Sequence, residues 1–236
     1  MRKIKLVCIP YAGGSVYCYN PWKKYLDSSI EMVFLELKGR GKRFNEEFDD
    51  SMREVVDDLY FQMKNIIRDG DYAIFGHSMG SIIAYELTKK IQGESDKTPL
   101  HVIYSGCNSP KYKSPVTYLY NAPIEELKAY FMTLGRTTEE VFDNEELSNI
   151  FIPIIRSDLK ILNGYKFDQN TRKLTCNASV FWGDKDCVVD YNKIVDWQTY
   201  HIPNINFYRF SGGHFYIFDC LFQVVMTINS ILLKLD

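Results

Sequence analysis

The apolar positions of the chain fall into short runs and longer periodic stripes that alternate along much of its length. Short runs of apolar and β-branched residues, bounded by glycine, proline or polar residues, are typical of buried strands. Stripes in which apolar residues recur at helical spacing predict amphipathic helices between them. We expect strands at residues 3–9, 32–35, 72–75, 100–105, 178–182 and 205–210, and helices at residues 21–26, 51–68, 81–90, 191–197 and 218–235.

The order of these elements predicts an α/β fold with an insertion. Strands and helices alternate up to the fourth strand, which favours a mostly parallel central sheet flanked by helices. The alternation stops at residues 108–175, where helical patterns occupy residues 124–134 and 144–162 and Pro153 lies inside the second. A helical lid is inserted at such a place, although core packing alone explains most of its apolar residues. We expect one domain over residues 1–236 that contains this helical lid insertion.

Composition limits the class of protein further. The net charge of −2 gives no overall field that favours nucleic acid. The six cysteines are scattered without a C-x-x-C pair, which argues against a zinc site and a disulfide framework. The chain starts directly with a strand-like run, and its apolar runs are far shorter than the ~18 residues of a membrane span. We therefore expect a cytoplasmic protein without signal peptide, transmembrane helix, metal or bound cofactor.

The clearest chemical signal lies between the third strand and the following helix. Residues 76–80 read Gly76-His77-Ser78-Met79-Gly80, a G-x-S-x-G pattern. In the context of strand, tight turn and helix, this pattern predicts a nucleophile elbow that exposes the serine hydroxyl above the sheet. The alternative is an ordinary tight turn with a capping serine. The elbow hypothesis therefore needs a base, a group that orients it and an oxyanion hole from other parts of the chain.

A glycine pair follows the first strand, in the segment Tyr11-Ala12-Gly13-Gly14. In serine hydrolases, such a loop supplies one oxyanion donor, and the residue after the nucleophile supplies the other. The backbone N–H groups of Ala12 and Met79 are therefore the candidate donors. A plain glycine turn is the alternative. A phosphate-binding loop is a weaker one, because the chain has neither G-x-G-x-x-G nor the Lys-Ser/Thr of a P-loop here.

Three polar residues each come just past the end of a predicted strand: Ser78, Asp186 and His214. In an open parallel sheet, the carboxyl ends of the strands meet at one edge, where ligands bind. The order Ser, Asp, His is that of α/β-hydrolases. His214 would take the proton from Ser78, and the aspartate would hold the imidazole tautomer. An acyl-enzyme would form on Ser78, and water would release the acid.

The remaining histidines and aspartates compete less well for these roles. His77 adjoins the nucleophile, and its side chain should point elsewhere; His101 opens a strand and His201 lies in a loop before the last strand. For the acid we favour Asp186, because it follows Gly183 at the spacing usual for such a loop, and Asp184 is its main rival. The weaker candidates are Asp190 and Asp219.

A basic loop with two glycines, Lys38-Gly39-Arg40-Gly41-Lys42-Arg43, follows the second strand. Most runs of this kind are solvated loops. The more specific interpretation is that this loop binds a phosphate group or an acidic partner.

Several segments resemble a known family. They are Pro10-Tyr11-Ala12-Gly13-Gly14-Ser15, Gly39-Arg40, Gly76-His77-Ser78-Met79-Gly80, Phe151-Ile152-Pro153, Arg156-Ser157-Asp158 and Gly212-Gly213-His214-Phe215. Together they resemble the external, type II thioesterases of non-ribosomal peptide and polyketide synthases, with the medium-chain thioesterase of fatty acid synthase as a relative. The first loop and the Arg-x-Asp segment are more discriminating than the elbow. Lys38 departs from the family, which usually has a proline there.

The resemblance implies a substrate and a partner. Such enzymes hydrolyse acyl or aminoacyl thioesters on the phosphopantetheine arm of carrier proteins, and so clear mis-primed or stalled groups from the synthase. The helical insertion would admit the arm, and the basic loop at residues 38–43 could dock an acidic carrier domain. The partners implied are an acyl or peptidyl carrier protein and a small acyl group. Neither nucleic acid nor a membrane is implied, and a monomer is expected.

Three alternatives stay open. A general carboxylesterase or lipase would use the same triad, and a chain-releasing thioesterase would set product length in fatty acid or polyketide synthesis. A non-catalytic binding protein with a hydrolase fold comes from a different class. Such proteins usually lack a triad member, whereas all three candidates are present here.

Overall fold

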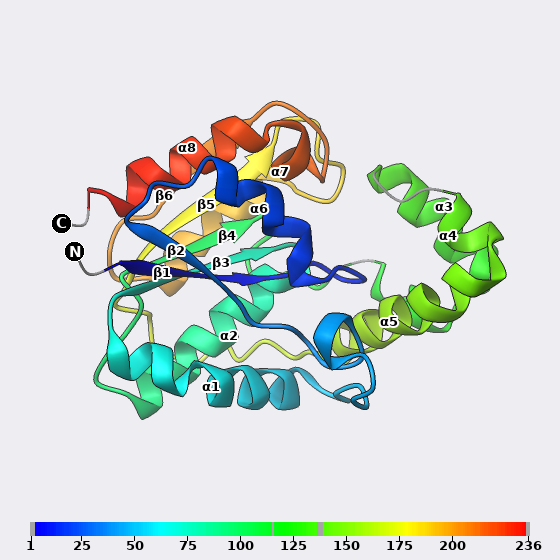
Figure 1. The fold of residues 1–236 in the computed structure, drawn as a ribbon, viewed down its shortest axis with the longest axis horizontal. Helices are drawn as coiled ribbons and strands as arrows, with labels where there is room; N and C mark the ends of the chain where they lie inside the picture. Colours follow the sequence, from blue (N-terminus) through cyan, green and yellow to red (C-terminus); the bar gives the residue numbers. More distant parts are fainter. Residues whose placement is uncertain (1–2, 115, 136–138, 235–236) are drawn as a thin grey trace.

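A parallel sheet forms the centre of the molecule (Figure 1). The computed structural model describes residues 3–114, 116–135 and 139–234. Within them the sheet has six strands in the order β2-β1-β3-β4-β5-β6, and each neighbouring pair is parallel. Each predicted strand is present. The bounds are β1 Ile4–Ile9, β2 Ile30–Phe34, β3 Tyr72–His77, β4 His101–Ser105, β5 Asn177–Gly183 and β6 Asn206–Phe210.

Helices cover both faces of the sheet, and each face has its own apolar core. In Figure 1, α1 (Met52–Asp69) and α2 (Met79–Glu94) lie below the sheet, and α8 (Leu221–Leu232) lies above it. The α1–α2 face also receives α6 (Tyr191–Ile194) and the 3-10 helix η4 (Val195–Tyr200). The core of the α8 face includes residues of α7 (Tyr216–Asp219) and of the 3-10 helix η1 (Val16–Lys24). The short 3-10 helix η2 covers Gly41–Arg43.

Helix α1 shows how the sequence determines a local element. The side chain of Ser51 accepts a hydrogen bond from the backbone N–H of Glu54, as expected for an N-cap. The Glu54 carboxylate accepts from the backbone N–H of Asp50, one residue earlier than in a standard capping box. The apolar stripe of the helix is buried against the sheet and α2. Both the start and the buried face of α1 therefore follow from the sequence.

In the described part of the chain, four helical elements lie between β4 and β5. They are η3 (Thr117–Asn121), α3 (Ile124–Leu134), α4 (Glu140–Asp143) and α5 (Glu145–Gly164). Figure 1 shows α3, α4 and α5 as an arm at one end of the sheet. The arm has a small apolar cluster of its own, which includes Leu127, Phe131, Phe142 and Leu159. The predicted insertion also contains residues 115 and 136–138, which lie outside the described residues.

Three predicted helices differ in the structure. The helix predicted at residues 191–197 is divided into α6 (Tyr191–Ile194) and the 3-10 helix η4 (Val195–Tyr200). The segment predicted as a helix at residues 21–26 is the end of a 3-10 helix, η1 (Val16–Lys24), which contains Pro21 and begins at the cap Ser15. A proline has no backbone N–H to donate, so the α-helical ladder is not favoured there. The closing helix is divided into α7 (Tyr216–Asp219) and α8, with Cys220 between them. Within the described residues, no helix is both long and apolar enough to span a membrane.

Two histidines are part of the core of the sheet. His101 Nε2 lies 2.8 Å from the hydroxyl of Ser179. His201 Nε2 lies 3.0 Å from the hydroxyl of Tyr104. Burial lowers the pKa of each imidazole from 6.5 to about 4, and His201 adds to the lowering at His101. Both side chains are therefore neutral in the folded protein at neutral pH.

This burial makes the stability of the fold depend on pH. Between pH 6.5 and about 4, the unfolded chain protonates these histidines and the folded chain does not. The free energy of unfolding should therefore fall as the pH falls through this window, by up to about 1.4 kcal/mol per pH unit for each histidine. Urea unfolding at pH 7 and pH 5 measures this. The double variant His101→Gln/His201→Gln should show a shallower dependence; an unchanged dependence would contradict the explanation.

Candidate active site

Ser78 occupies a strained turn between β3 and α2. Its φ of 54° and ψ of −118° make it the one non-glycine residue with positive φ in the described part of the chain. Such a conformation costs of order 1–3 kcal/mol and persists where the surroundings enforce it. A Cβ atom on Gly76 would lie 2.0 Å from the carbonyl oxygen of Gly80, and one on Gly80 would lie 2.6 Å from that of Ile9. The two glycines therefore permit the turn that the elbow hypothesis requires.

The backbone near Ser78 offers two N–H groups. Met79 is the first residue of α2, so its N–H has no partner within the helix. Ala12 lies in the turn after β1, where Gly14 donates to the carbonyl of Tyr11 at 2.9 Å. Ala12, Ser78 and His214 line the same cavity. Within the described residues, neither the Ala12 nor the Met79 N–H donates to another protein atom. Both are available to an oxyanion.

The loops after β5 and β6 bring Asp186 and His214 together. His214 Nδ1 and Asp186 Oδ2 lie 2.9 Å apart, and both residues are buried. The other carboxylate oxygen of Asp186 accepts from the backbone N–H of Val188 at 2.9 Å. These contacts fix the carboxylate and leave the Nε2 side of the imidazole as its free edge.

The rival aspartates have other partners. Asp184 is exposed, and its carboxylate accepts from the backbone N–H of Gly212 at 2.9 Å. Asp190 caps α6 through the backbone N–H of Asn192, and Asp219 is the last residue of α7. The structure therefore places Asp186, and not Asp184, against His214.

Ser78 and His214 share a cavity but are not hydrogen-bonded to each other. Their link is therefore looser than the bond between His214 and Asp186. In enzymes without substrate, catalytic hydrogen bonds are often long and tighten only in the complex. The arrangement suits a base that receives the proton of Ser78 as substrate closes the site.

His77 lies behind His214, in a buried network that the sequence did not reveal. Its Nδ1 is 2.9 Å from the hydroxyl of Ser105, which also contacts the hydroxyl of Tyr216. The rings of His77 and His214 are 5.1 Å apart between centroids. Burial, and secondly the nearby His214, hold the pKa of His77 well below its ordinary value. His77 therefore supports the site as a neutral group, and His101 and His201 are core residues away from it.

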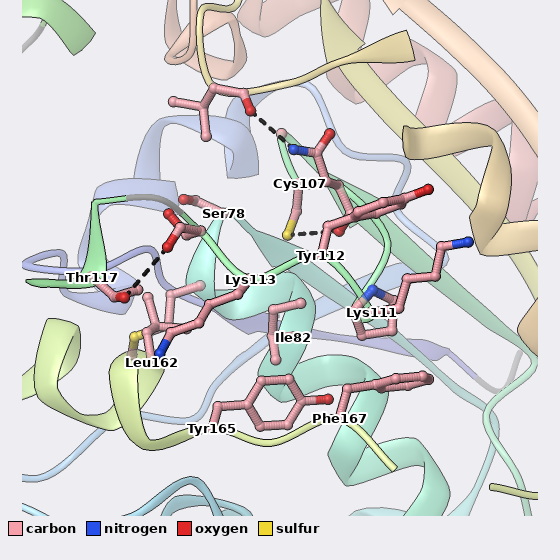
Figure 2. A pocket seen from close by; sticks show the side chains of 16 residues that line it. Ser78, Ile82, Cys107, Lys111, Tyr112, Lys113, Thr117, Leu162, Tyr165 and Phe167 are labelled. Atoms are coloured by element: carbon pink, nitrogen blue, oxygen red, sulfur yellow. Dashed lines mark hydrogen bonds between the residues drawn. The ribbon is translucent and has the colours of Figure 1, made fainter. Parts of the chain in front are cut away.

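A cavity of about 130 Å³ is lined by Ser78. Ser78 lies at one end of it (Figure 2). Tyr165 and Phe167 form the opposite end of this cavity, and Ile82 lies between them and Ser78 (Figure 2). A second cavity of about 50 Å³ also reaches Ser78, between the first loop and apolar residues of α3 and α5. The serine therefore stands where two cavities meet. Within the described residues, no group of three or more metal-binding side chains is present.

The basic loop after β2 is largely paired within the protein. Lys38 contacts Asp49, Arg43 contacts Asp58 and Arg40 contacts Asp158, each at 2.6 Å. Lys42 is exposed. Carboxylates of this chain already pair with Lys38, Arg40 and Arg43. Of the four basic residues of the loop, Lys42 is therefore the one that could contact an acidic partner.

Comparison with known proteins identifies the family. A family model of the thioesterase domain matches residues 4–232. The chain belongs to the thioesterase family. The resemblance inferred from the motifs is therefore confirmed, and so is the prediction of a thioester hydrolase.

Solved structures and a curated relative agree with this assignment. The chain is similar to ClbQ from the colibactin NRPS/PKS pathway, with 35% identity, a TM-score of 0.92, and coverage of 99% of this chain and 98% of that one. It is similar to the type II thioesterase BorB from the borrelidin biosynthetic cluster, with 27% identity, a TM-score of 0.85, and coverage of 97% and 92%. The medium-chain S-acyl fatty acid synthase thioesterase of Rattus norvegicus is 27% identical over 216 residues, 90% of this chain and 81% of the relative.

These matches also bear on the fold. The thioesterases found have the α/β-hydrolase fold, and the parallel six-stranded sheet with flanking helices is common to this chain. The predicted fold class is confirmed. The roles of the individual site residues stay predictions that rest on the geometry described above.

The contrast between Asp186 and Asp184 generates a test. Asp186→Asn keeps the shape of the side chain but removes the charge that holds the His214 tautomer, so kcat for a thioester should fall by about 10³–10⁴-fold. Asp184→Asn is the matched control, because it alters an exposed aspartate two residues away, and kcat should change by less than about threefold. Steady-state kinetics on one acyl thioester measures both. The assignment would be wrong if Asp184→Asn were the more damaging change.

Proposed function

We propose that this thioesterase hydrolyses acyl and aminoacyl thioesters carried on the phosphopantetheine arm of carrier proteins. The catalytic groups are Ser78, His214 and Asp186. The observation that carries the chemical part is the buried 2.9 Å contact of Asp186 with His214, on the cavity that also contains Ser78 and Ala12. The arrangement unites a nucleophile, an oriented base and free N–H donors.

In the proposed mechanism, each catalytic group has a defined role. His214 removes the proton from Ser78 Oγ as the oxygen attacks the thioester carbonyl, and Asp186 stabilises the imidazolium. The N–H groups of Ala12 and Met79 stabilise the oxyanion, where the loss of one donor typically costs about 10²–10³ in rate. The imidazolium then protonates the leaving thiolate, and an acyl-enzyme remains. His214 activates water, which releases the acid and restores Ser78.

The carrier substrate is supported by the relatives and by the shape of the site. ClbQ comes from an NRPS/PKS pathway, and BorB is a type II thioesterase of a biosynthetic cluster. A thioester on a carrier has a long arm on one side of the reacting carbon and an acyl group on the other. The two cavities that meet at Ser78 suit such a substrate. We propose that the enzyme edits synthases by clearing mis-primed or stalled acyl groups from their carrier domains. The active site needs no cofactor of its own. Helices α3–α5 form the lid over the site.

A second candidate function has one specific observation in its favour. The medium-chain thioesterase of Rattus norvegicus is 27% identical to this chain and belongs to fatty acid synthase. Release of finished medium chains is therefore the runner-up. It differs from editing in the length of the acyl group that is released fastest.

Carrier-bound substrates decide between the two. A carrier domain is loaded with acetyl, aminoacyl or longer acyl groups, and release is followed by intact-mass spectrometry. Editing predicts that acetyl and aminoacyl groups are released fastest, whereas chain release predicts that medium-length groups are. Faster turnover of p-nitrophenyl esters than of every carrier-bound group would favour a general carboxylesterase.

The nucleophile is tested in the same assay. Ser78→Ala removes the acyl-accepting hydroxyl, so hydrolysis should fall by at least about 10⁴-fold. Ser28→Ala, in an exposed turn, is the control and should hydrolyse at the wild-type rate. Hydrolysis that survives in Ser78→Ala would overturn the mechanism.

A further inference from the structure

Arg40 and Asp158 form an ion pair inside the protein. The two guanidinium nitrogens Nη1 and Nη2 donate to Asp158 Oδ2 and Oδ1 at 2.7 and 2.6 Å. The side chains are only 4% and 1% exposed. Arg40 comes from the loop after β2, and Asp158 comes from α5 of the insertion. The pair therefore joins the body of the molecule to the arm at a point that water does not reach.

The same pair holds the loop after β1. Asp158 Oδ2 also accepts a hydrogen bond from the backbone N–H of Gly13 at 2.7 Å. Arg40 Nη1 donates to the carbonyl oxygen of Gly14 at 3.1 Å. Gly13 has a φ of 79°, and a Cβ atom there would lie 2.7 Å from Cγ1 of Ile155 on α5. The residue next to Ala12 is thus packed against α5 and hydrogen-bonded to it.

A second carboxylate fixes the far end of the loop. The hydroxyl of Ser15 donates to Glu36, and the backbone N–H of Val16 lies 3.5 Å from the other oxygen of Glu36. Contacts from other segments therefore reach Gly13, Gly14 and Ser15 in turn, while the N–H of Ala12 is left without a protein acceptor in the described structure. The loop is held so that one donor stays available.

We infer that Arg40 and Asp158 are positioning residues that fix the Ala12 N–H in the oxyanion hole and link that hole to helix α5. This inference rests on the proposed function. A movement of α5 at Asp158 would pull on Gly13, so the hole is assembled only while this part of the arm is docked. A misplacement of about 1 Å at a catalytic group can cost about 10²-fold in rate. The hydrogen bonds from Gly13 to Asp158 and from Arg40 to Gly14 therefore affect the rate, although they are remote from the substrate.

Asp158→Asn tests the link. An amide cannot accept from both Gly13 and the two guanidinium nitrogens, so the loop should lose part of its support. We expect kcat to fall by about 10–100-fold with KM within about twofold of the wild type. Rates are expressed per active site titrated with a fluorophosphonate, so that unfolded molecules do not count. Asp49→Asn is the matched control, because Asp49 is a similarly buried partner of a cation, Lys38, away from the loop; its kcat should stay within about twofold.

A double variant separates positioning from stability. Arg40→Met/Asp158→Leu removes both charges, so no buried charge is left unpaired, and apolar replacement of buried pairs is often well tolerated. If the pair only stabilises the fold, kcat per titrated site should equal that of the wild type. If it positions the loop, kcat should stay at least about 10-fold low while the melting temperature approaches the wild-type value. Wild-type kcat per titrated site in both Asp158→Asn and the double variant would overturn the inference.

Ser78→Ala separates this inference from the proposed function. Hydrolysis retained in Ser78→Ala would contradict the mechanism itself. An inactive Ser78→Ala together with wild-type kcat per titrated site in both Asp158→Asn and the double variant would contradict only the positioning role.

Discussion

The close approach of two backbones determines the geometry of the site. The first turn of α2 passes so near the end of β1 that a Cβ atom on Gly80 would lie 2.6 Å from the carbonyl oxygen of Ile9. Strands β1 and β3 are neighbours at the point where the strand order reverses, which is where open α/β sheets bind ligands. This contact brings the elbow serine and the loop that contains Ala12 to one cavity. The oxyanion chemistry proposed for Ser78 depends on it.

Three other parts of the chain complete the site on this framework. The loops after β5 and β6 supply a carboxylate–imidazole pair, and α5 supplies a buried carboxylate to the loop after β1. Because these groups are buried, their electrostatic interactions are stronger than they would be in water. The same burial demands that every charge be paired, and Arg40 with Asp158 meets this demand in the interior.

The sequence predicted the parts that depend on local patterns. The strands and the long helices follow from apolar periodicity, and the site residues follow from their positions after strand ends. The 3-10 helix Val16–Lys24 was missed because it is short, contains Pro21 and is determined by packing. The break of the closing helix at Cys220 has no local breaker residue. The pairing of Arg40 with Asp158 joins residues 118 positions apart, and only the folded chain reveals it.

The proposed mechanism requires that Ser78 accept the acyl group. The most direct measurement is to mix the enzyme with an acyl-carrier thioester, stop the reaction with acid within milliseconds, and map the acylated peptide by mass spectrometry. We expect an acyl mass on the peptide that contains Ser78, formed and lost at rates compatible with turnover. Turnover without that adduct, or an adduct on a different side chain such as Cys107 at the edge of the cavity, would contradict it.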